Sequence, residues 1–474
     1  MQSEADFEQF AQQEEAVKTA YQYFMRVDPE MRDILGPIEE FEDELTGRPM
    51  RKRWAKVGMT RGVSEENMKE MTVYLDPFPH IRQEKGKDLQ GWYSSKGDNL
   101  LAGQRDRPCE TDAILTQPYG GFCSVGCVFC YINSGTRGYR GSGLISVPVG
   151  YGDHVRKQLR SMQVSAAGYF SSFTDPFLPL EEWYHNTQSG ATAFVEMGLP
   201  IFFLSRLHYP GWAFDLLSKN KYSYAQKSIN TGNPETWKKL SPGAISLDEH
   251  LDEIRELRRR GIYVSIQCNP IIPGVVDHDD VELLFERLAE AGANHVIVKF
   301  VEAGHAWAGA MRERIAKKFP GPRSERFAEL FTENQGGGQK TIVEPYRREA
   351  HARYQAKATS LGMTYALCYE FTKSLGGIWR SMGPEFLTAD QCHGHRVPMH
   401  RALDITTHVD KERQVLFTPI EDCPPSGCLR CADSREKDKT PPCGSTLLPQ
   451  AKALRLPDYR SAYKKHGHIP LNPA

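Results

Sequence analysis

The sequence contains no long apolar run and no excess of charge of one sign. No apolar segment approaches the ~20 residues needed to span a bilayer, and the acidic, polar N-terminus has no signal-peptide core. We therefore expect a cytoplasmic protein with no membrane partner. The 59 basic residues almost balance the 60 acidic ones, so no overall electric field attracts nucleic acid. Composition thus allows a nucleic-acid partner but does not favour one.

Evenly spread cysteine pairs are also missing, although the chain has 11 cysteines. Three of them crowd into residues 123–130 and four into 423–443. In a cytoplasmic chain such groups are typical of metal sites rather than disulfides. Cys268 and Cys368 stand alone in apolar strands, and we expect them to be buried as small apolar side chains.

The length of 474 residues predicts more than one domain. Residues 1–107 hold little strand pattern, and the amphipathic spacing at 3–24 indicates a helix, so we expect an N-terminal helical extension. Residues 108–305 would form the catalytic body, and 306–387 an extension that closes it. Residues 388–474 would form a small cysteine-rich domain organised by metal.

The catalytic body alternates short apolar strands with helical segments. One helix should begin after Ser246 as N-cap and end at Gly261. This alternation implies an α/β fold with a parallel sheet, and right-handed crossovers would curl the sheet into a partial or full barrel. The site should lie in the loops after the carboxyl ends of the strands. Strands are expected at 113–116, 169–173, 201–204, 224–229, 263–268 and 295–300, and a later one at 364–369.

Cys123, Cys127 and Cys130 follow the first strand at Cys-x3-Cys-x2-Cys spacing. Three thiolates leave one iron of a [4Fe–4S] cluster without a protein ligand. That iron can chelate the amino and carboxylate groups of a methionine moiety, which places a sulfonium beside the cluster for cleavage to a 5′-deoxyadenosyl radical. Tyr131 would pack on the adenine. A structural zinc site, the alternative, would need a fourth ligand that this loop lacks.

With the segments that follow it, this loop resembles the radical S-adenosylmethionine (SAM) superfamily, and within it the spore photoproduct lyase-like branch. The resemblance covers roughly residues 113–300 and includes Thr-Asp-Pro-Phe-Leu-Pro-Leu-Glu at 174–181, Ser-Ile at 228–229 and Pro-Ile-Ile-Pro-Gly at 270–274. It implies a partial (β/α)6 radical SAM barrel, a SAM-binding [4Fe–4S] cluster, and an electron donor such as flavodoxin or ferredoxin.

The resemblance also implies a set of SAM-binding residues. Ser171, Ser172 and Thr174 would line the amino-acid end of SAM, and Ser228 would contact the ribose or the carboxylate. Where the family commonly has Thr-Lys-Ser, this chain has Ser-Arg-Leu, so Arg206 would grip the carboxylate with its planar guanidinium. Capping of strand ends is an equally open role for these polar residues.

The second group of cysteines has the spacing Cys428-x2-Cys431-x11-Cys443, with Cys423 upstream and Cys392 further back. It resembles the auxiliary-cluster domains that follow radical SAM barrels, and it predicts a second [4Fe–4S] cluster. Such a cluster would bind substrate, relay electrons or donate sulfur. A zinc ribbon is the alternative, because four Cys or His ligands suit zinc as well.

We therefore expect a radical SAM enzyme that cleaves SAM reductively and removes hydrogen from a small-molecule or nucleoside-like substrate. One alternative is a spore photoproduct lyase-like enzyme that acts on nucleic acid and has a C-terminal zinc module. Another is a non-enzymatic zinc-binding interaction protein. Gln267 and Glu302 are expected near the barrel mouth, and a late strand with Tyr365, Tyr369 and Glu370 would close the cavity. The sequence assigns no side chain a catalytic role.

Overall fold

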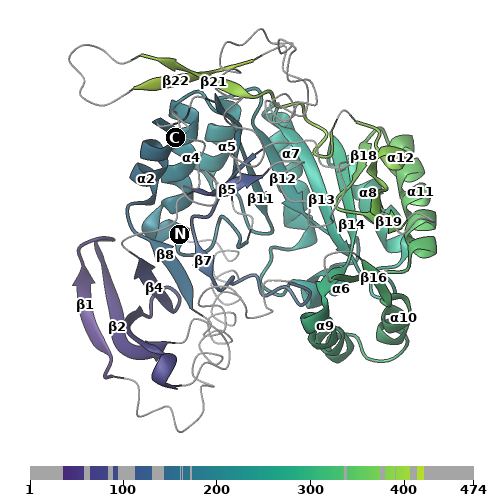
Figure 1. Cartoon of the computed structure of the whole chain (residues 1–474), viewed down its shortest axis with the longest axis horizontal. Helices are drawn as coiled ribbons and strands as arrows, with labels where there is room; N and C mark the ends of the chain where they lie inside the picture. Colours follow the sequence, from purple (N-terminus) through teal and green to yellow (C-terminus); the bar gives the residue numbers. More distant parts are fainter. Residues whose placement is uncertain are drawn as a thin grey trace.

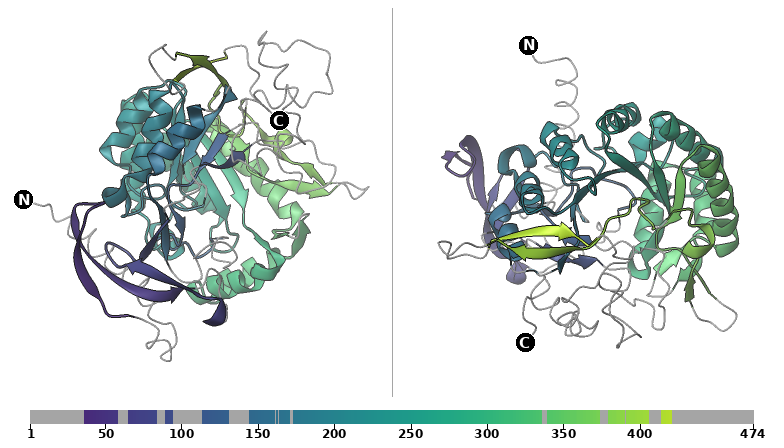
Figure 2. Two further views of the ribbon diagram at one scale, coloured as in Figure 1. Left: turned by 60° about the vertical axis from the view of Figure 1, so that its left-hand side comes forward. Right: turned by 90° about the horizontal axis from the view of Figure 1, so that it is seen from above.

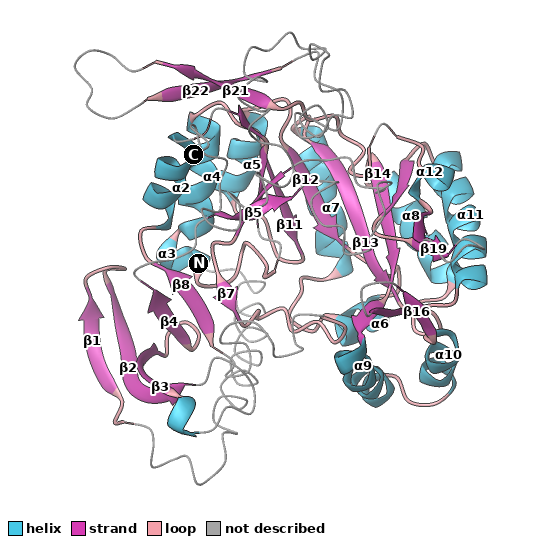
Figure 3. Ribbon diagram, in the orientation of Figure 1, coloured by secondary structure: helices cyan, strands magenta, loops and turns pink. Residues whose placement is uncertain are grey.

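The computed structural model describes most of the chain between residues 36 and 420. A parallel β-sheet and its helices dominate this part of the chain, and smaller antiparallel sheets flank them (Figures 1 and 3). The described residues are 36–57, 65–83, 89–93, 113–130, 144–160, 162, 164–170, 173–335, 339–373, 379–389, 391–405 and 414–420.

Eight strands make the central sheet. In order across the sheet they are β18 (Thr364–Leu367), β14 (His295–Phe300), β13 (Tyr263–Ile271), β12 (Tyr224–Ser228), β11 (Ile201–Ser205), β10 (Ala167–Phe170), β6 (Ala113–Thr116) and β5 (Leu89–Tyr93). The first seven run parallel, and β5 is antiparallel to β6. The predicted α/β fold with a parallel sheet is therefore confirmed, and every predicted strand overlaps an observed one.

Helices connect the parallel strands and form an outer layer around them when the molecule is seen from above (Figure 2). In α7, the Ser246 hydroxyl accepts from the Glu249 N–H and the Glu249 carboxylate accepts from the Ser246 N–H, as an N-cap requires. Gly261, with φ of 75°, follows the end of this helix as predicted. The helices are α2 (Tyr151–Arg160), α3 (Glu181–Tyr184), α4 (Asn186–Glu196), α5 (Gly211–Ser218), α6 (Pro234–Leu240), α7 (Leu247–Arg259), α8 (His278–Glu290) and α11 (Glu344–Ser360).

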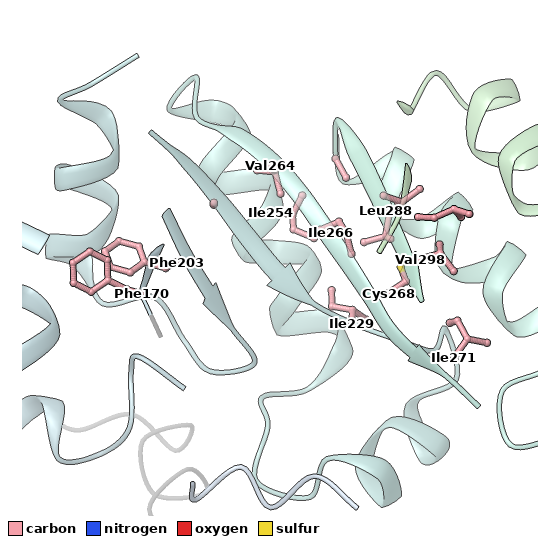
Figure 4. Close-up of a cluster of buried hydrophobic side chains, with 14 of the residues drawn as sticks. Phe170, Phe203, Ile229, Ile254, Val264, Ile266, Cys268, Ile271, Leu288 and Val298 are labelled. Carbon is pink, nitrogen blue, oxygen red and sulfur yellow. The ribbon is translucent and has the colours of Figure 1, made fainter. Parts of the chain in front are cut away.

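One face of the central sheet packs against this helical layer. Val264, Ile266 and Cys268 of β13 belong to a buried cluster with Ile254 of α7 and Leu288 of α8 (Figure 4). All of these side chains are inaccessible to solvent. Cys268 is therefore the buried small side chain that the sequence predicts. The same prediction is wrong for Cys368, which is partly exposed because it follows the end of the last strand of the sheet, at Leu367.

The other face carries stacked aromatic rings near the amino ends of the strands. The ring centroids of Phe202 and Tyr224 lie 4.6 Å apart. The segment before β21 lies over them: His393 Nδ1 is 2.5 Å from the Tyr224 hydroxyl, and the ring of His395 stacks on Tyr263 with centroids 4.6 Å apart. These contacts occupy the amino ends of the strands, so a site on this face lies toward the carboxyl ends.

Four strands lie between residues 39 and 83, which corrects the expectation of little strand structure before residue 107. In β2 only Met50, Ala55 and Val57 are buried, and five of its ten residues are basic. An antiparallel strand with one solvated face needs few apolar residues. The many charged residues of β2 therefore made the alternation of buried and exposed positions hard to recognise in the sequence. The helix predicted at 3–24 lies outside the described residues. This second sheet contains, in order, β1 (Glu39–Asp43), β2 (Arg48–Val57), β3 (Lys69–Tyr74), β4 (His80–Gln83), β8 (Ile145–Pro148) and β7 (Gly120–Gly121).

Short elements complete the described chain. β21 (His400–Asp404) and β22 (Val415–Pro419) form a hairpin, and β21 also pairs with β9 (Val164–Ser165). This hairpin is the last described part of the predicted cysteine-rich domain. Among the helices of the described residues, none is both long and apolar enough to cross a membrane. The other elements are β15 (Glu302–Gly304), α9 (His305–Lys318), α10 (Pro322–Leu330), β16 (Glu333–Gln335), β17 (Gln339–Thr341), β19 (Phe371–Lys373), β20 (Trp379–Ser381) and α12 (Gly383–Phe386).

Candidate active site

The cysteines of the predicted cluster share one loop, which follows β6 and the short strand β7. Two backbone hydrogen bonds form successive turns in this loop, from the Gly126 N–H to the Cys123 carbonyl oxygen (3.3 Å) and from the Cys130 N–H to the Cys127 carbonyl oxygen (3.2 Å). Each cysteine residue is partly exposed. Desolvation of its sulfur raises the pKa of the Cys123 thiol, and the charges of Asp175, Cys127 and Cys130 raise it further. The three sulfurs are therefore close enough to interact.

The donor chemistry of this loop suits an iron–sulfur cluster, although no cage is preformed. Across the described ranges, no three His, Cys, Asp or Glu side chains already enclose a position for a metal ion. Thiolates are the usual ligands of such clusters, and three of them come from this loop. The residues of this loop therefore fit the predicted cluster in their chemistry.

The segment after α6 holds the cysteine loop from one side. The Val128 N–H donates to the Leu240 carbonyl oxygen (2.9 Å), and the Gly243 N–H donates to the Val125 carbonyl oxygen (3.0 Å). A Cβ atom on Gly243 would collide with the Ser124 carbonyl oxygen, so only glycine permits this close approach. The loop is thus fixed by tertiary contacts as well as by its own turns.

Thr174 holds the base of the same loop. Its hydroxyl donates to the Tyr119 carbonyl oxygen (2.9 Å), and the Gln117 side-chain amide donates to that hydroxyl (2.8 Å). Thr174 is buried. The structure therefore places Thr174 at the turn that leads into the cysteines, and its contact with SAM stays a prediction.

Asp175 ties the loop after β10 to the end of β11. Its carboxylate accepts hydrogen bonds from the Ser205 hydroxyl (2.9 Å), the Arg206 N–H (2.7 Å) and the Phe177 N–H (3.0 Å). Burial raises the pKa of this carboxyl, and the donors oppose the shift. Asp175 thereby sets the position of the backbone that carries Arg206.

Glu181, the last residue of the motif at 174–181, also links separate segments through its carboxylate. It accepts hydrogen bonds from the Tyr119 hydroxyl (2.6 Å), the Thr187 N–H (2.9 Å) and the Gln188 N–H (2.8 Å). Burial raises the pKa of Glu181 to about 7. The motif thus joins the start of α4 to the residues before the cysteine loop, which the sequence alone did not indicate.

Arg206 reaches the cysteine loop from the carboxyl end of β11. Its guanidinium lies 5.1 Å from the ring centroids of both Phe129 and Trp237, and it donates to the Ser241 hydroxyl (3.1 Å) and the Asn269 carbonyl oxygen (3.0 Å). The side chain is buried. A permanent positive charge therefore lies beside the predicted cluster, where the sequence prediction requires it for an anion such as the SAM carboxylate.

Lys227 fixes the backbone next to Arg206. Its ammonium group donates to the Leu207 carbonyl oxygen (2.8 Å) and to the Glu253 carboxylate on α7. Because Lys227 points toward the helices, its neighbours Gln226 and Ser228 face the opposite side of the sheet. Ser228 is buried at the carboxyl end of β12, and its contact with SAM stays a prediction.

Several predicted residues lie outside the described part of the chain, and one described residue lies away from this loop. Tyr131, Ser171 and Ser172 lie outside the described residues, as do four C-terminal cysteines. Cys392 lies near the amino ends of the strands, where it packs against Ala366 and its carbonyl oxygen is 2.8 Å from His295 Nε2. The cysteine triplet and Cys392 are thus at opposite ends of the sheet. The C-terminal cysteines concerned are Cys423, Cys428, Cys431 and Cys443.

Sequence reasoning missed two polar residues on the face turned away from the helices. Gln226 and Ser265 are paired in register on β12 and β13 and are buried. The Gln226 amide nitrogen and the Ser265 hydroxyl have no hydrogen-bond partner. Buried polar groups are normally satisfied, so this pair indicates a place for a polar ligand or water. The sequence could have indicated both residues, because each alternates along its strand with residues that face the helices.

Glu370, which follows β18, joins the carboxyl end of β14 to α11 through a hydrogen bond and a buried ion pair. Arg347 of α11 donates to the Glu370 carboxylate (2.7 Å), and the other oxygen of Glu370 accepts from the Phe300 N–H (2.6 Å). Nearby, the Lys299 ammonium forms an ion pair with Glu302. Glu302 and Glu370 therefore lie at the strand ends as expected, and Glu370 has a structural partner.

Comparisons with known proteins identify the group to which this chain is related. No protein-family model matches it. The "Radical SAM Nalpha-GlyT isomerase" of Pseudomonas phage M6 is 60% identical over 455 residues, which are 94% of this chain and 92% of that relative. A spore photoproduct lyase complexed with dinucleoside spore photoproduct has a TM-score of 0.40 at 16% identity, covering 58% of this chain and 79% of the lyase. Streptococcus suis SuiB bound to S-adenosylmethionine has a TM-score of 0.36 at 12% identity, covering 53% and 49%. These structural likenesses are too weak to argue from, but the sequence relationship is decisive: the chain belongs to the radical SAM enzymes.

Proposed function

We propose that this chain is an isomerase that acts on Nα-GlyT, as the name of its phage relative indicates for that protein. The 60% identity over 94% of the chain carries the proposal. The substrate would then belong to the nucleoside-like or small-molecule class expected from the sequence. No observation on the described residues favours the lyase-like alternative on nucleic acid. A non-enzymatic zinc protein is set aside because the chain belongs to an enzyme family.

In this proposal Cys123, Cys127 and Cys130 would hold the [4Fe–4S] cluster, and SAM would bind at the iron that has no cysteine ligand. When bound, the cluster and SAM supply a 5′-deoxyadenosyl radical. Arg206 would hold the SAM carboxylate, and Ser228 the ribose or carboxylate, because both lie at carboxyl ends of neighbouring strands. Tyr131, Ser171, Ser172 and Thr174 complete the proposed SAM contacts. The parallel strands would curve as a partial (β/α)6 barrel around them.

The substrate would bind on the sheet face that turns away from the helices. Two features support this placement: the partnerless Gln226 amide nitrogen and Ser265 hydroxyl lie on that face, and the strands lead from them toward the cysteine loop. The amide nitrogen of Gln226 can donate only, whereas the Ser265 hydroxyl can donate or accept. The pair would therefore recognise a carbonyl oxygen of the substrate.

Isomerisation makes a specific prediction about mass. Incubated without oxygen with SAM, a flavodoxin or ferredoxin reductant and Nα-GlyT, the protein should convert Nα-GlyT to a new species of identical mass but different chromatographic retention. Liquid chromatography with mass spectrometry measures this. The matched control omits SAM and should show no conversion. A product of altered mass, or no product from protein that still cleaves SAM, would contradict the proposed reaction.

We also propose a second [4Fe–4S] cluster on Cys428, Cys431 and Cys443, with Cys423 or Cys392 as a further ligand. The native chain should then contain about eight iron atoms after anaerobic reconstitution, and a Cys428→Ala, Cys431→Ala double variant about four. Iron, sulfide and zinc analyses on the same samples check this. About four irons in both proteins, with zinc lost only from the variant, would instead support the zinc module.

A further inference from the structure

Ser241 lies between the cation of Arg206 and one cysteine of the cluster loop. The Ser241 Oγ is 3.1 Å from Arg206 Nη1 and 3.4 Å from Cys127 Sγ. The residue is 1% exposed, so water does not compete for either contact. A buried chain of hydrogen-bonding groups thus runs from a permanent positive charge to the sulfur of a proposed cluster ligand.

The chemistry of the two neighbours decides the direction of both hydrogen bonds. A guanidinium can only donate, so the Ser241 oxygen accepts from Arg206. A cysteine bound to iron is a thiolate without its proton, so Cys127 can only accept. The single hydroxyl proton of Ser241 is therefore directed to Cys127.

From this geometry we infer that Ser241 donates a hydrogen bond to the Cys127 thiolate and thereby raises the reduction potential of the SAM-binding cluster. The inference rests on the proposed cluster ligands but not on the identity of the substrate. Reduction adds negative charge to the cluster and its sulfurs, and hydrogen bonds to the sulfurs stabilise that charge. Arg206 strengthens the effect by polarising the Ser241 hydroxyl. A higher potential makes the cluster easier to reduce by a flavodoxin or ferredoxin.

The surroundings hold Ser241 in this position. Its N–H donates to the Trp237 carbonyl oxygen (2.9 Å) at the end of α6, and Gly243 nearby is bonded to the cysteine loop at Val125 (3.0 Å). On the other side, Arg206 is fixed through Asn269 (3.0 Å) and through its own N–H to Asp175 (2.7 Å). The hydroxyl therefore acts as a positioning group within a rigid junction.

A threonine and a valine at position 241 test the inference, because these side chains have nearly the same shape and differ in the hydroxyl. The full chain is reconstituted anaerobically, its iron and sulfide contents are measured, and the cluster is titrated by potential-controlled electron paramagnetic resonance without SAM or substrate. We expect Ser241→Thr to match the native midpoint potential and Ser241→Val to be more negative. Equal potentials for the two variants would overturn the inference. Exposed Ser360, replaced by alanine, should change nothing.

A second measurement needs only the native protein and covers the case in which a variant assembles no cluster. Pulsed electron paramagnetic resonance in H2O and D2O detects exchangeable protons coupled to the reduced cluster. A coupled hydroxyl proton should appear in the native spectrum, and its absence would contradict the hydrogen bond. Failure of the isomerase proposal would leave both measurements unchanged, since neither contains substrate.

Discussion

A Cys127→Ala variant, reconstituted without oxygen, should lose SAM cleavage. Without substrate, the rate of 5′-deoxyadenosine formation should fall more than about 100-fold, because loss of even an outer partner of a metal ligand costs 10–100-fold. Cys127 lies in the middle of the triplet, and no other cysteine of the described residues lies in the loop besides Cys123 and Cys130. Chromatographic quantification of 5′-deoxyadenosine, with iron analysis on the same sample, measures the effect.

Cys268→Ala is the matched control for this variant. Cys268 lies on β13 of the central sheet, where its side chain is buried against the helices and belongs to no predicted ligand set. Its replacement should leave iron content and 5′-deoxyadenosine formation near native values, with only a small loss of stability. A Cys127→Ala protein that cleaves SAM at the native rate would refute the proposed cluster ligands.

Replacing Arg347 by methionine should destabilise the fold by about 3–5 kcal/mol, the typical cost of leaving one charge of a buried ion pair without its partner. Arg347 is inaccessible to solvent and donates to the Glu370 carboxylate and to the Ile342 and Phe371 carbonyl oxygens. In the variant Glu370 would lose its hydrogen-bonded cation and keep only the charge of Lys299, so its pKa, already raised by burial, would rise further. Denaturant titration followed by circular dichroism measures the loss.

Two further variants separate the buried charge from the loss of side-chain contacts. Arg348→Met removes the neighbouring arginine on the same helix, whose partners Glu344 and Glu385 are partly exposed, and should cost no more than about 1 kcal/mol. An Arg347→Met, Glu370→Met double variant should be more stable than Arg347→Met alone, because the buried Glu370 carboxylate is no longer stranded and Glu333, the other carboxylate paired with Arg347, is partly exposed. Equal stability of the single and double variants would show that the ion pair is not the cause.

The central sheet could be predicted because its signals are local. The strands at 113–116 and 295–300 are observed with the predicted bounds, since each is a short apolar run between helical or turn segments. The end signals of α7, Ser246 and Gly261, lie within one turn of the helix and need no tertiary contact to be recognised. The sheet of β1 to β4 was missed because its core face contributes few apolar residues among many charged ones.

The amino-acid sequence by itself determined the donor chemistry proposed for the cysteine loop, because Cys123, Cys127 and Cys130 place three thiols within eight consecutive residues. Only the tertiary structure decided what surrounds those sulfurs. Ser241 stands 114 residues after Cys127, and Arg206 directly follows the end of β11, yet their side chains meet at the same loop. Spacing along a chain specifies groups within one loop, whereas contacts between distant segments depend on how helices and strands pack.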